Sequence, residues 1–284
     1  MVGGKTKLLG ILGKGIGHTL SPLLHNEAAK ILKKDAIYVP FDMPPAGLQS
    51  FLKAFWEMGG IGCNVTLPYK SLLASMIPGH TLISVNTFYR GEETWRAAST
   101  DAAGFSRGVS RLGLKLSGFN RFVLLGNGGA CASILSYLAK ELGQSPDEIV
   151  VLRRNPARDI EQSNLFGDQF SPRFVPFTKE SLKQEIGGRG GDNILIQTSS
   201  APLQGASLSE YCYALDGYRG AFVDLTYGCY SALLERAESI GVPCQNGIPM
   251  LIEQARLSQE YWWGESASYD QLYDAVTRSG VVSI

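Results

Sequence analysis

Short apolar runs alternate with stretches of helical periodicity over the first third of the chain. In order, the pattern predicts a strand at 7–12, a helix at 22–32, a strand at 36–43, a helix at 45–58, and strands at 61–67, 81–89 and 94–98. The last two strands flank the turn Arg90-Gly91-Glu92. Such alternation is typical of parallel βαβ units, so we expect an α/β fold.

The middle of the chain contains a strand, a glycine-rich turn and a helix in succession. An apolar run from Arg121 leads into Gly126-Asn127-Gly128-Gly129-Ala130-Cys131, and apolar residues then recur at helical spacing over 133–142. In a dinucleotide-binding turn, glycines let the backbone approach a pyrophosphate and the helix N-terminus offers free N–H groups. Cys131 stands where a third glycine or an alanine is usual. Because the chain has 33 glycines, a chance match is the alternative for this pattern alone.

The next predicted strand indicates which dinucleotide is bound. This strand, at 148–152, ends on Arg153-Arg154-Asn155, about 20 residues beyond the glycine turn, where the ribose is recognised in such folds. An NAD site has a carboxylate there, whereas guanidinium groups pair with the 2′-phosphate of NADP. The sequence therefore predicts NADP(H) as the cofactor. Two solvated arginines at the end of a strand are the alternative.

The rest of the pattern predicts two domains. A helix from 101 to about 112 leads to the glycine turn, and the later elements are strands at 174–176, 193–197 and 221–226, then helices at 249–263 and 267–278. No strand follows the last two helices, so we expect them to pack on the first domain.

These elements predict a catalytic domain made of 1–105 and 247–284, and an NADP-binding domain at 106–246. Because ligands of open α/β sheets bind at the carboxyl ends of the strands, we expect the substrate in the cleft between the two domains.

Composition narrows the possible partners. The formal net charge is 0, so we expect no nucleic-acid and no membrane partner. No apolar run approaches the roughly 20 residues of a membrane helix, and no signal peptide is apparent, so we expect a cytoplasmic protein. The five cysteines include no C-x-x-C pair and are expected to be reduced thiols. The three histidines lack ligand spacing, so no metal site is predicted.

Two residues are candidates for acid–base chemistry. Lys70 follows the strand at 61–67 on a turn marked by Pro68, where a lysine can donate a proton to an oxyanion. Asp101 opens a helix, and its simpler interpretation is a helix-capping acid. Most loop lysines are merely solvated, and spacing alone does not pair these two residues.

Seven motifs, in order along nearly the whole chain, resemble those of the shikimate dehydrogenase family. They are His18-Thr-Leu-Ser21-Pro22 with His25-Asn26, Asn64-Val-Thr66-Leu-Pro68-Tyr69-Lys70, Ser84-Val-Asn86-Thr87, Thr100-Asp101-Ala-Ala-Gly104, Gly126-Asn-Gly128-Gly129-Ala130, Asp224-Leu-Thr-Tyr227 through Leu233-Leu234, and Gly247-Ile-Pro-Met250-Leu251 with Gln254. The resemblance implies a split α/β catalytic domain and a Rossmann-type, doubly wound NADP-binding domain, in a monomer or homodimer.

The resemblance also implies an activity and roles for these residues. It implies reversible, NADP-dependent reduction of 3-dehydroshikimate to shikimate, with Lys70 and Asp101 as the catalytic pair. The substrate-binding residues that it implies are Thr19, Ser21, Thr66, Asn86, Tyr227 and Gln254. The cofactor-binding residues are Gly126, Asn127, Gly128, Gly129, Ala130, Arg153, Arg154, Asn155 and Gly247.

Departures from the family pattern keep alternatives open. Thr19 stands where serine is typical, Ser84 where alanine is typical, and Gln197-Thr-Ser-Ser where Asn-Ala-Thr-Ser is usual. The chain therefore resembles a divergent member, for which quinate or an aminoshikimate is an alternative substrate. Two further alternatives are an NADP(H) sensor without turnover and another two-domain NADP enzyme, such as a methylenetetrahydrofolate dehydrogenase.

Overall fold

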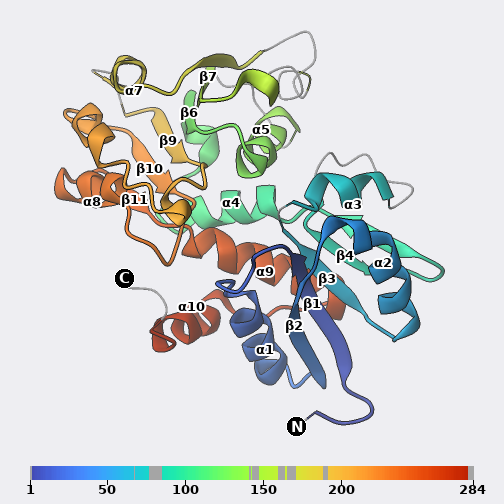
Figure 1. Ribbon diagram of the computed structural model, residues 1–284. Coiled ribbons are helices and arrows are strands. Elements are labelled where there is room, and N and C mark those ends of the chain that lie inside the picture. The colour runs from blue at the N-terminus through green and yellow to red at the C-terminus, as the bar shows by residue number, and fades with distance from the viewer. Residues whose placement is uncertain are drawn as a thin grey trace. The chain divides into compact units, whose positions relative to one another are not determined.

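Figure 1 shows the fold as a computed structural model, which describes residues 2–66, 68–76, 85–140, 142, 147–158, 164, 171–187 and 191–280. The chain forms two compact units, one comprising Met1–Gly104 and Ile252–Val282 and the other Phe105–Leu251. The divisions fall within the helices α4 (Asp101–Ser110) and α9 (Ile248–Trp263). Both helices are therefore shared by the two units in sequence.

The first unit is built on a mixed sheet with the strand order β2-β1-β3-β4-β5. The strands are β1 (Lys7–Gly13), β2 (Ala36–Asp42), β3 (Gly62–Val65), β4 (Thr87–Arg90) and β5 (Trp95–Ala98). β1 runs parallel to β2 and β3, whereas the β3–β4 and β4–β5 pairs are antiparallel. The strands predicted at 7–12, 36–43, 61–67 and 94–98 are thus confirmed to within two residues at each end. For the strand predicted at 81–89, residues 81–84 lie outside the described residues, and β4 begins at Thr87.

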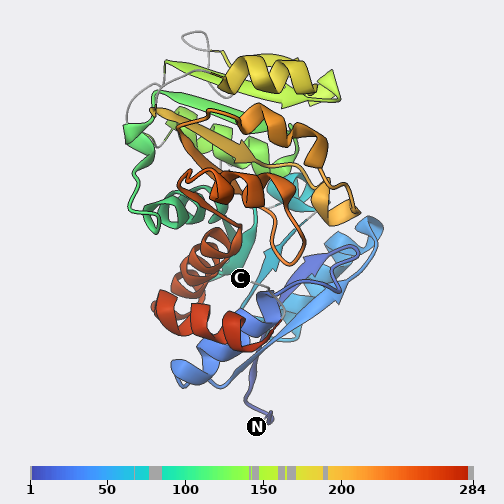
Figure 2. The ribbon, with the colours of Figure 1, turned by 90° about the vertical axis from the view of Figure 1, so that its left-hand side faces the viewer.

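Most helices of the first unit lie between its strands in sequence, whereas α10 comes after all of them. They are α1 (Ser21–Ile31), the 3₁₀ turn η1 (Pro45–Gly47), α2 (Leu48–Glu57), α3 (Lys70–Met76) and α10 (Tyr269–Arg278). The short helix α3 was not predicted. α10 packs against α1, as Figure 2 shows for the red and blue helices, so the last helix does return to the first unit. No helix in the described part of the chain is long and apolar enough to cross a membrane.

The second unit contains a parallel sheet with the order β11-β10-β9-β6-β7-β8. Its strands are β6 (Arg121–Leu125), β7 (Glu148–Arg153), β8 (Arg173–Pro176), β9 (Asn193–Gln197), β10 (Ala221–Asp224) and β11 (Cys244–Gln245). The chain moves outward from β6 in one direction and returns beside it at β9. This reversal of direction defines a doubly wound sheet, with a switch point between β6 and β9.

Helices cover both faces of this sheet. Successive strand residues point to opposite faces, so each strand contributes side chains to the packing on both sides. The helices are α5 (Gly129–Lys140), α7 (Lys179–Ile186) and α8 (Ala232–Ser239), with 3₁₀ turns η2 (Leu116–Gly118), η3 (Pro156–Arg158), η5 (Pro202–Gln204) and η6 (Ser209–Leu215). Leu124 and Val151 pack against α5, whereas Leu125 and Val150 pack in the cluster that contains α7, η6 and α8. Burial on both faces explains the uninterrupted apolar runs from which these strands were predicted.

A partly buried ion-pair cluster joins four segments of the second unit, β6, β7, α7 and β8. The guanidinium of Arg121, at the start of β6, contacts Glu148 at 2.5 Å and Glu185 on α7 at 2.5 Å. Arg173, on β8, contacts the same two carboxylates at 2.8 and 2.6 Å. Burial raises the pKa of Glu148, but hydrogen bonds from Arg121 and Arg173 outweigh it and hold that pKa below its usual value.

Candidate active site

Lys70 and Asp101 form a close ion pair in the first unit. Lys70 is the first residue of α3 and Asp101 the first residue of α4, and Lys70 Nζ lies 2.5 Å from Asp101 Oδ2. Their side chains are 18% and 5% exposed, so the pair is largely withdrawn from water. The prediction that Lys70 lies on a turn was wrong in detail, since α3 begins at this residue. Pro68, two positions earlier, disfavours helix in the residues before it, so the helix starts after the proline.

The strand topology explains why residues distant in sequence meet here. Two antiparallel pairings in succession make β5 run in the same direction as β3, and Asn64, Thr87 and Ala98 stand in register across β3, β4 and β5. The segments after β3 and β5 therefore leave the sheet at one edge, where the segment before β4 enters. Lys70 and Asp101 belong to the first two segments, and Asn86 belongs to the third.

Asn86 and Gln254 complete a hydrogen-bonded cluster with this pair. The Asn86 side chain is buried, and its Nδ2 donates to Asp101 Oδ1 at 2.8 Å and to Gln254 Oε1, on α9, at 3.1 Å. Its Oδ1 accepts a hydrogen bond from the backbone N–H of Thr100 at 2.8 Å. Helices α4 and α9 approach closely at Gly104, where an added Cβ atom would lie 2.9 Å from the backbone nitrogen of Gln254. Four of the predicted site residues thus lie together.

The other predicted substrate residues of this unit lie at the ends of neighbouring strands. Thr66 follows β3, is half-buried, and donates its backbone N–H to the Leu12 carbonyl at 2.9 Å. Thr19 lies between β1 and α1, Ser21 is the first residue of α1, and their hydroxyl oxygens are 3.2 Å apart. Because β1 is parallel to β3, these hydroxyl groups follow carboxyl strand ends at the same edge of the sheet.

The second unit forms the predicted glycine turn. Gly126 directly follows β6 and has a φ of +102°, and an added Cβ atom would lie 2.8 Å from the Cβ of Ser199. No atom lies within 4 Å of the Cβ position of Gly128, so the backbone there has open space in front of it. α5 begins at Gly129, so the N–H groups of its first turn, which includes Ala130, have no partner within the helix.

The predicted arginines lie beside this turn, because β6 and β7 are adjacent parallel strands. Arg153 ends β7 and is half-buried, and Arg154 and Asn155 are exposed. Asn127 donates from Nδ2 to the Asn155 carbonyl at 2.6 Å, which ties the glycine turn to the arginine segment. An open glycine cradle, a helix N-terminus and two neighbouring guanidinium groups together fit a phosphorylated dinucleotide.

Two predicted residues lie at the far side of the same sheet. Tyr227 comes shortly after β10 and is half-buried. Gly247 precedes α9, and an added Cβ atom there would lie 2.3 Å from the Leu225 carbonyl oxygen. Its backbone N–H donates to the Thr226 carbonyl at 3.0 Å. The observed reason for glycine at position 247 is therefore a close approach of two backbone segments.

Sequence reasoning missed several polar residues around Asn86. Thr100 contacts Asn86 through both its backbone and its hydroxyl group, and Thr87 and Ser258 are fully buried nearby. Ser258 lies four positions after Gln254, on the same face of α9, which is the one sequence signal that could have identified it.

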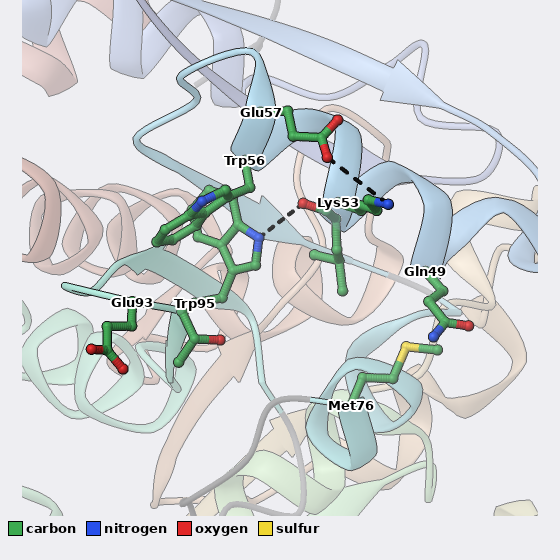
Figure 3. Close-up of a pocket in the computed structure, with 9 residues that line it drawn as sticks. Gln49, Lys53, Trp56, Glu57, Met76, Glu93 and Trp95 are labelled. Atoms are coloured by element: carbon green, nitrogen blue, oxygen red, sulfur yellow. Dashed lines mark hydrogen bonds and ion pairs between the residues drawn. The ribbon is translucent and has the colours of Figure 1, made fainter.

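A cavity of about 440 Å³ lies elsewhere in the first unit, between α2, the end of α3 and β5 (Figure 3). It contains none of the predicted site residues. Leu52 and Trp95 form part of its buried wall, and the side chains of Lys53 and Glu57 are 80% and 64% exposed at its rim. Those two charges lie 4.0 Å apart, and this exposed pair gives the cavity no buried charge with which to orient a ligand. Among the described residues, no group of three or more His, Cys, Asp or Glu side chains is placed to hold a metal ion.

Comparisons with known proteins identify the family. Residues 11–79 match the shikimate dehydrogenase substrate binding domain. The chain is 32% identical over 273 residues to the shikimate dehydrogenase (NADP(+)) of Geobacter sulfurreducens, with 92% of each chain covered. The crystal structure of shikimate 5-dehydrogenase from Thermus thermophilus, in complex with NADP(H) and shikimate, has a TM-score of 0.77 and 26% identity over 96% of this chain and all of that chain. The crystal structure of shikimate 5-dehydrogenase from Listeria monocytogenes has the same fold, with a TM-score of 0.83 and 24% identity. The match covers 97% of this chain and 98% of that chain. The chain belongs to the shikimate dehydrogenase family.

Proposed function

We propose that this protein is an NADP-dependent shikimate dehydrogenase, which interconverts 3-dehydroshikimate and shikimate. The observation that carries the proposal is the 2.5 Å contact of Lys70 with Asp101, inside a cluster that also holds Asn86 and Gln254. The relative from Geobacter sulfurreducens bears the name of this activity. The first unit has the proposed role of binding the substrate and the second that of binding NADP.

The proposed mechanism assigns acid–base chemistry to Lys70 and Asp101. NADPH, when bound, would supply the hydride that reduces the C3 carbonyl carbon of 3-dehydroshikimate. The carbonyl oxygen then acquires negative charge, and the Lys70 ammonium group donates a proton to it. Asp101, 2.5 Å from Nζ, would orient Nζ toward the reacting oxygen. In the reverse direction, the neutral Lys70 amine would accept the hydroxyl proton of shikimate while the hydride would pass from C3 to NADP+.

The remaining residues of the first unit are proposed to hold the substrate by directional hydrogen bonds. Asn86, Gln254 and Thr66 would bind the ring hydroxyl groups. Thr19 and Ser21 would bind the carboxylate, with help from Tyr227. A small polyhydroxylated acid exchanges its water shell for such bonds, because each unpaired polar group costs roughly 1–3 kcal/mol.

The cofactor proposal places the pyrophosphate of NADP on the glycine turn and its 2′-phosphate on the arginine segment. The residues proposed for this are Gly126, Asn127, Gly128, Gly129, Ala130, Arg153, Arg154, Asn155 and Gly247. We also propose the cytoplasm as the compartment, in keeping with five free cysteines, and a monomer or homodimer as the assembly.

Replacing Arg154 by glutamine is expected to raise the KM for NADP+ about 10- to 100-fold and to leave the KM for NAD+ nearly unchanged. The physical reason is that a charge-assisted bond to a phosphate contributes about 1.5–3 kcal/mol. Initial rates at varied NADP+ and NAD+ concentrations give both constants. Arg219→Gln, another exposed arginine of the same unit, is the matched control. Equal changes for both cofactors would remove the 2′-phosphate assignment.

The direct test of the function is the initial rate of NADP+ reduction by the purified protein with shikimate, with quinate, and with NAD+ in place of NADP+. Rapid turnover of shikimate with NADP+ is expected. Faster turnover of quinate than of shikimate would make quinate the proposed substrate. The structural reason would be the Thr19 methyl group, which alters the end of the pocket assigned to the carboxylate. No turnover of either compound would contradict the proposed activity.

A further inference from the structure

Two buried hydroxyl groups meet beside Asn86. Thr87 begins β4 and Ser258 lies within α9, and both side chains are 0% exposed. Their Oγ atoms are 2.9 Å apart. Buried hydroxyl groups are destabilising unless they are hydrogen-bonded, and an apolar pair of similar size would avoid that cost. Their full burial also means that neither hydroxyl group reaches a substrate.

Thr87 contacts the amide oxygen of Asn86. Its Oγ1 lies 3.2 Å from Asn86 Oδ1, and the backbone N–H of Thr100 donates to the same oxygen at 2.8 Å. With two donors on this side, the oxygen must face them, and the NH2 group must face the acceptors on Asp101 and Gln254. Rotation of the amide by half a turn would instead place its oxygen against the Asp101 carboxylate.

The neighbouring hydrogen bonds leave the Thr87 hydrogen available for this contact. Asn64 Nδ2, on β3, lies 2.9 Å from Ser258 Oγ and 3.0 Å from Thr87 Oγ1, so its two N–H groups can serve both hydroxyl oxygens. Ser258 Oγ lies 3.1 Å from the backbone carbonyl of Gln254, one helical turn earlier. The single Ser258 hydrogen can be donated either to Thr87 Oγ1, 2.9 Å away, or to this carbonyl, and donation to Thr87 links β4 to α9.

We propose that Thr87 and Ser258 are positioning residues of this site. They hold the Asn86 amide in the orientation that donates to Asp101, and through that bond they keep the Asp101 carboxylate aligned with Lys70. The kinetic consequence rests on the proposed function. The orientation of the amide is a property of the folded chain and can be tested separately.

Two substitutions at position 87 separate positioning from packing. Thr87→Val keeps the shape of the side chain and removes the hydroxyl group, whereas Thr87→Ser keeps the hydroxyl group and removes a buried methyl group. We expect Thr87→Val to lower kcat for shikimate about tenfold, as for one lost hydrogen bond, with KM within about threefold. Thr87→Ser should keep kcat within about twofold of wild type. A packing role predicts the reverse order, because only serine leaves a cavity.

Further variants check the assignment to this pair. Ser258→Ala is expected to lower kcat in the same direction as Thr87→Val. Thr277→Val is the matched control, because it makes the same change at an exposed position on α10 of the same unit. Equal kcat values for wild type and Thr87→Val in an enzyme active on shikimate would overturn the inference.

Crystal structures of both Thr87 variants, at about 1.2 Å resolution or better, provide a readout that does not depend on activity. In Thr87→Val, the distance from Asn86 Nδ2 to Asp101 Oδ1 is expected to lengthen from 2.8 Å, and in Thr87→Ser it should stay unchanged. An unchanged amide in Thr87→Val would overturn the inference. If wild type fails to oxidise shikimate, the proposed function fails, and the amide orientation still decides this inference.

Discussion

Replacing Lys70 by methionine is expected to reduce kcat for shikimate by about 10²- to 10⁴-fold, the usual contribution of a positioned acid–base group. Substrate affinity should stay within about tenfold of wild type, because the interaction of Lys70 with the reacting oxygen becomes strong only in the transition state. Methionine retains the length of the apolar stem. Steady-state kinetics together with the dissociation constant of shikimate separate the two effects.

Two further variants make this result interpretable. Lys53→Met changes an exposed lysine of the same unit and should leave kcat unchanged. Lys70→Met leaves the Asp101 carboxylate, which is 5% exposed, without its lysine partner, so Lys70→Met/Asp101→Asn restores charge balance. Because residues that act as a unit have non-additive effects, the double variant should be about as slow as the single one. A loss confined to substrate binding would contradict the proposed role of Lys70.

Replacing Arg121 by methionine is expected to destabilise the second unit by about 3–5 kcal/mol. Its guanidinium group is buried against Glu148 and Glu185 and also donates to the Glu185 backbone carbonyl at 2.6 Å. Removal of the buried Arg121 leaves one uncompensated carboxylate charge beside Glu185, whose side chain is 4% exposed. Arg173 still pairs with both carboxylates, but it cannot neutralise two of them.

Urea unfolding followed by circular dichroism measures this change. With a slope of about 1–3 kcal/mol per molar for a unit of this size, the midpoint should fall by roughly 1–5 M, or the unit should not fold. Arg236→Met is the matched control, because Arg236 lies 2.5 Å from Asp216 in the same unit, with 38% and 58% of the two side chains exposed. An exposed pair contributes less than about 1 kcal/mol. Equal midpoints for the two variants would show that burial of the cluster has little effect.

The strands were predictable where burial on a sheet dictates the pattern of residues. β9 was predicted with its full bounds, because five successive buried residues, Asn193–Gln197, stand between polar loops. β11 was missed, because two half-buried residues are too few to show an alternation of apolar and polar positions. α3 was missed because the sequence around Pro68 indicates a turn, and a seven-residue helix after it is too short to show a clear apolar face.

The candidate site was predictable in its members and less so in its geometry. Resemblance supplied Lys70 and Asp101, but their meeting depends on the antiparallel pairings of β4, which spacing alone does not reveal. The contact between the Thr87 and Ser258 hydroxyl groups was not predicted, because threonine in a strand and serine in a helix are ordinary residues until their neighbours are known. Local pattern thus identifies elements, whereas the contacts between them come from tertiary pairing.

The bond between Asn86 and Gln254 has a consequence for biosynthesis. Gln254 is synthesised 153 residues after Asp101, so the cluster stays incomplete while the whole of Phe105–Leu251 leaves the ribosome. At about 5–20 residues per second, this delay is roughly 8–30 s. The second unit is one continuous segment and is able to fold during that interval, whereas the first unit must wait for the last part of the chain. A nascent chain that stops before α9 therefore lacks the Gln254 side of the proposed substrate site, however well its first hundred residues have folded.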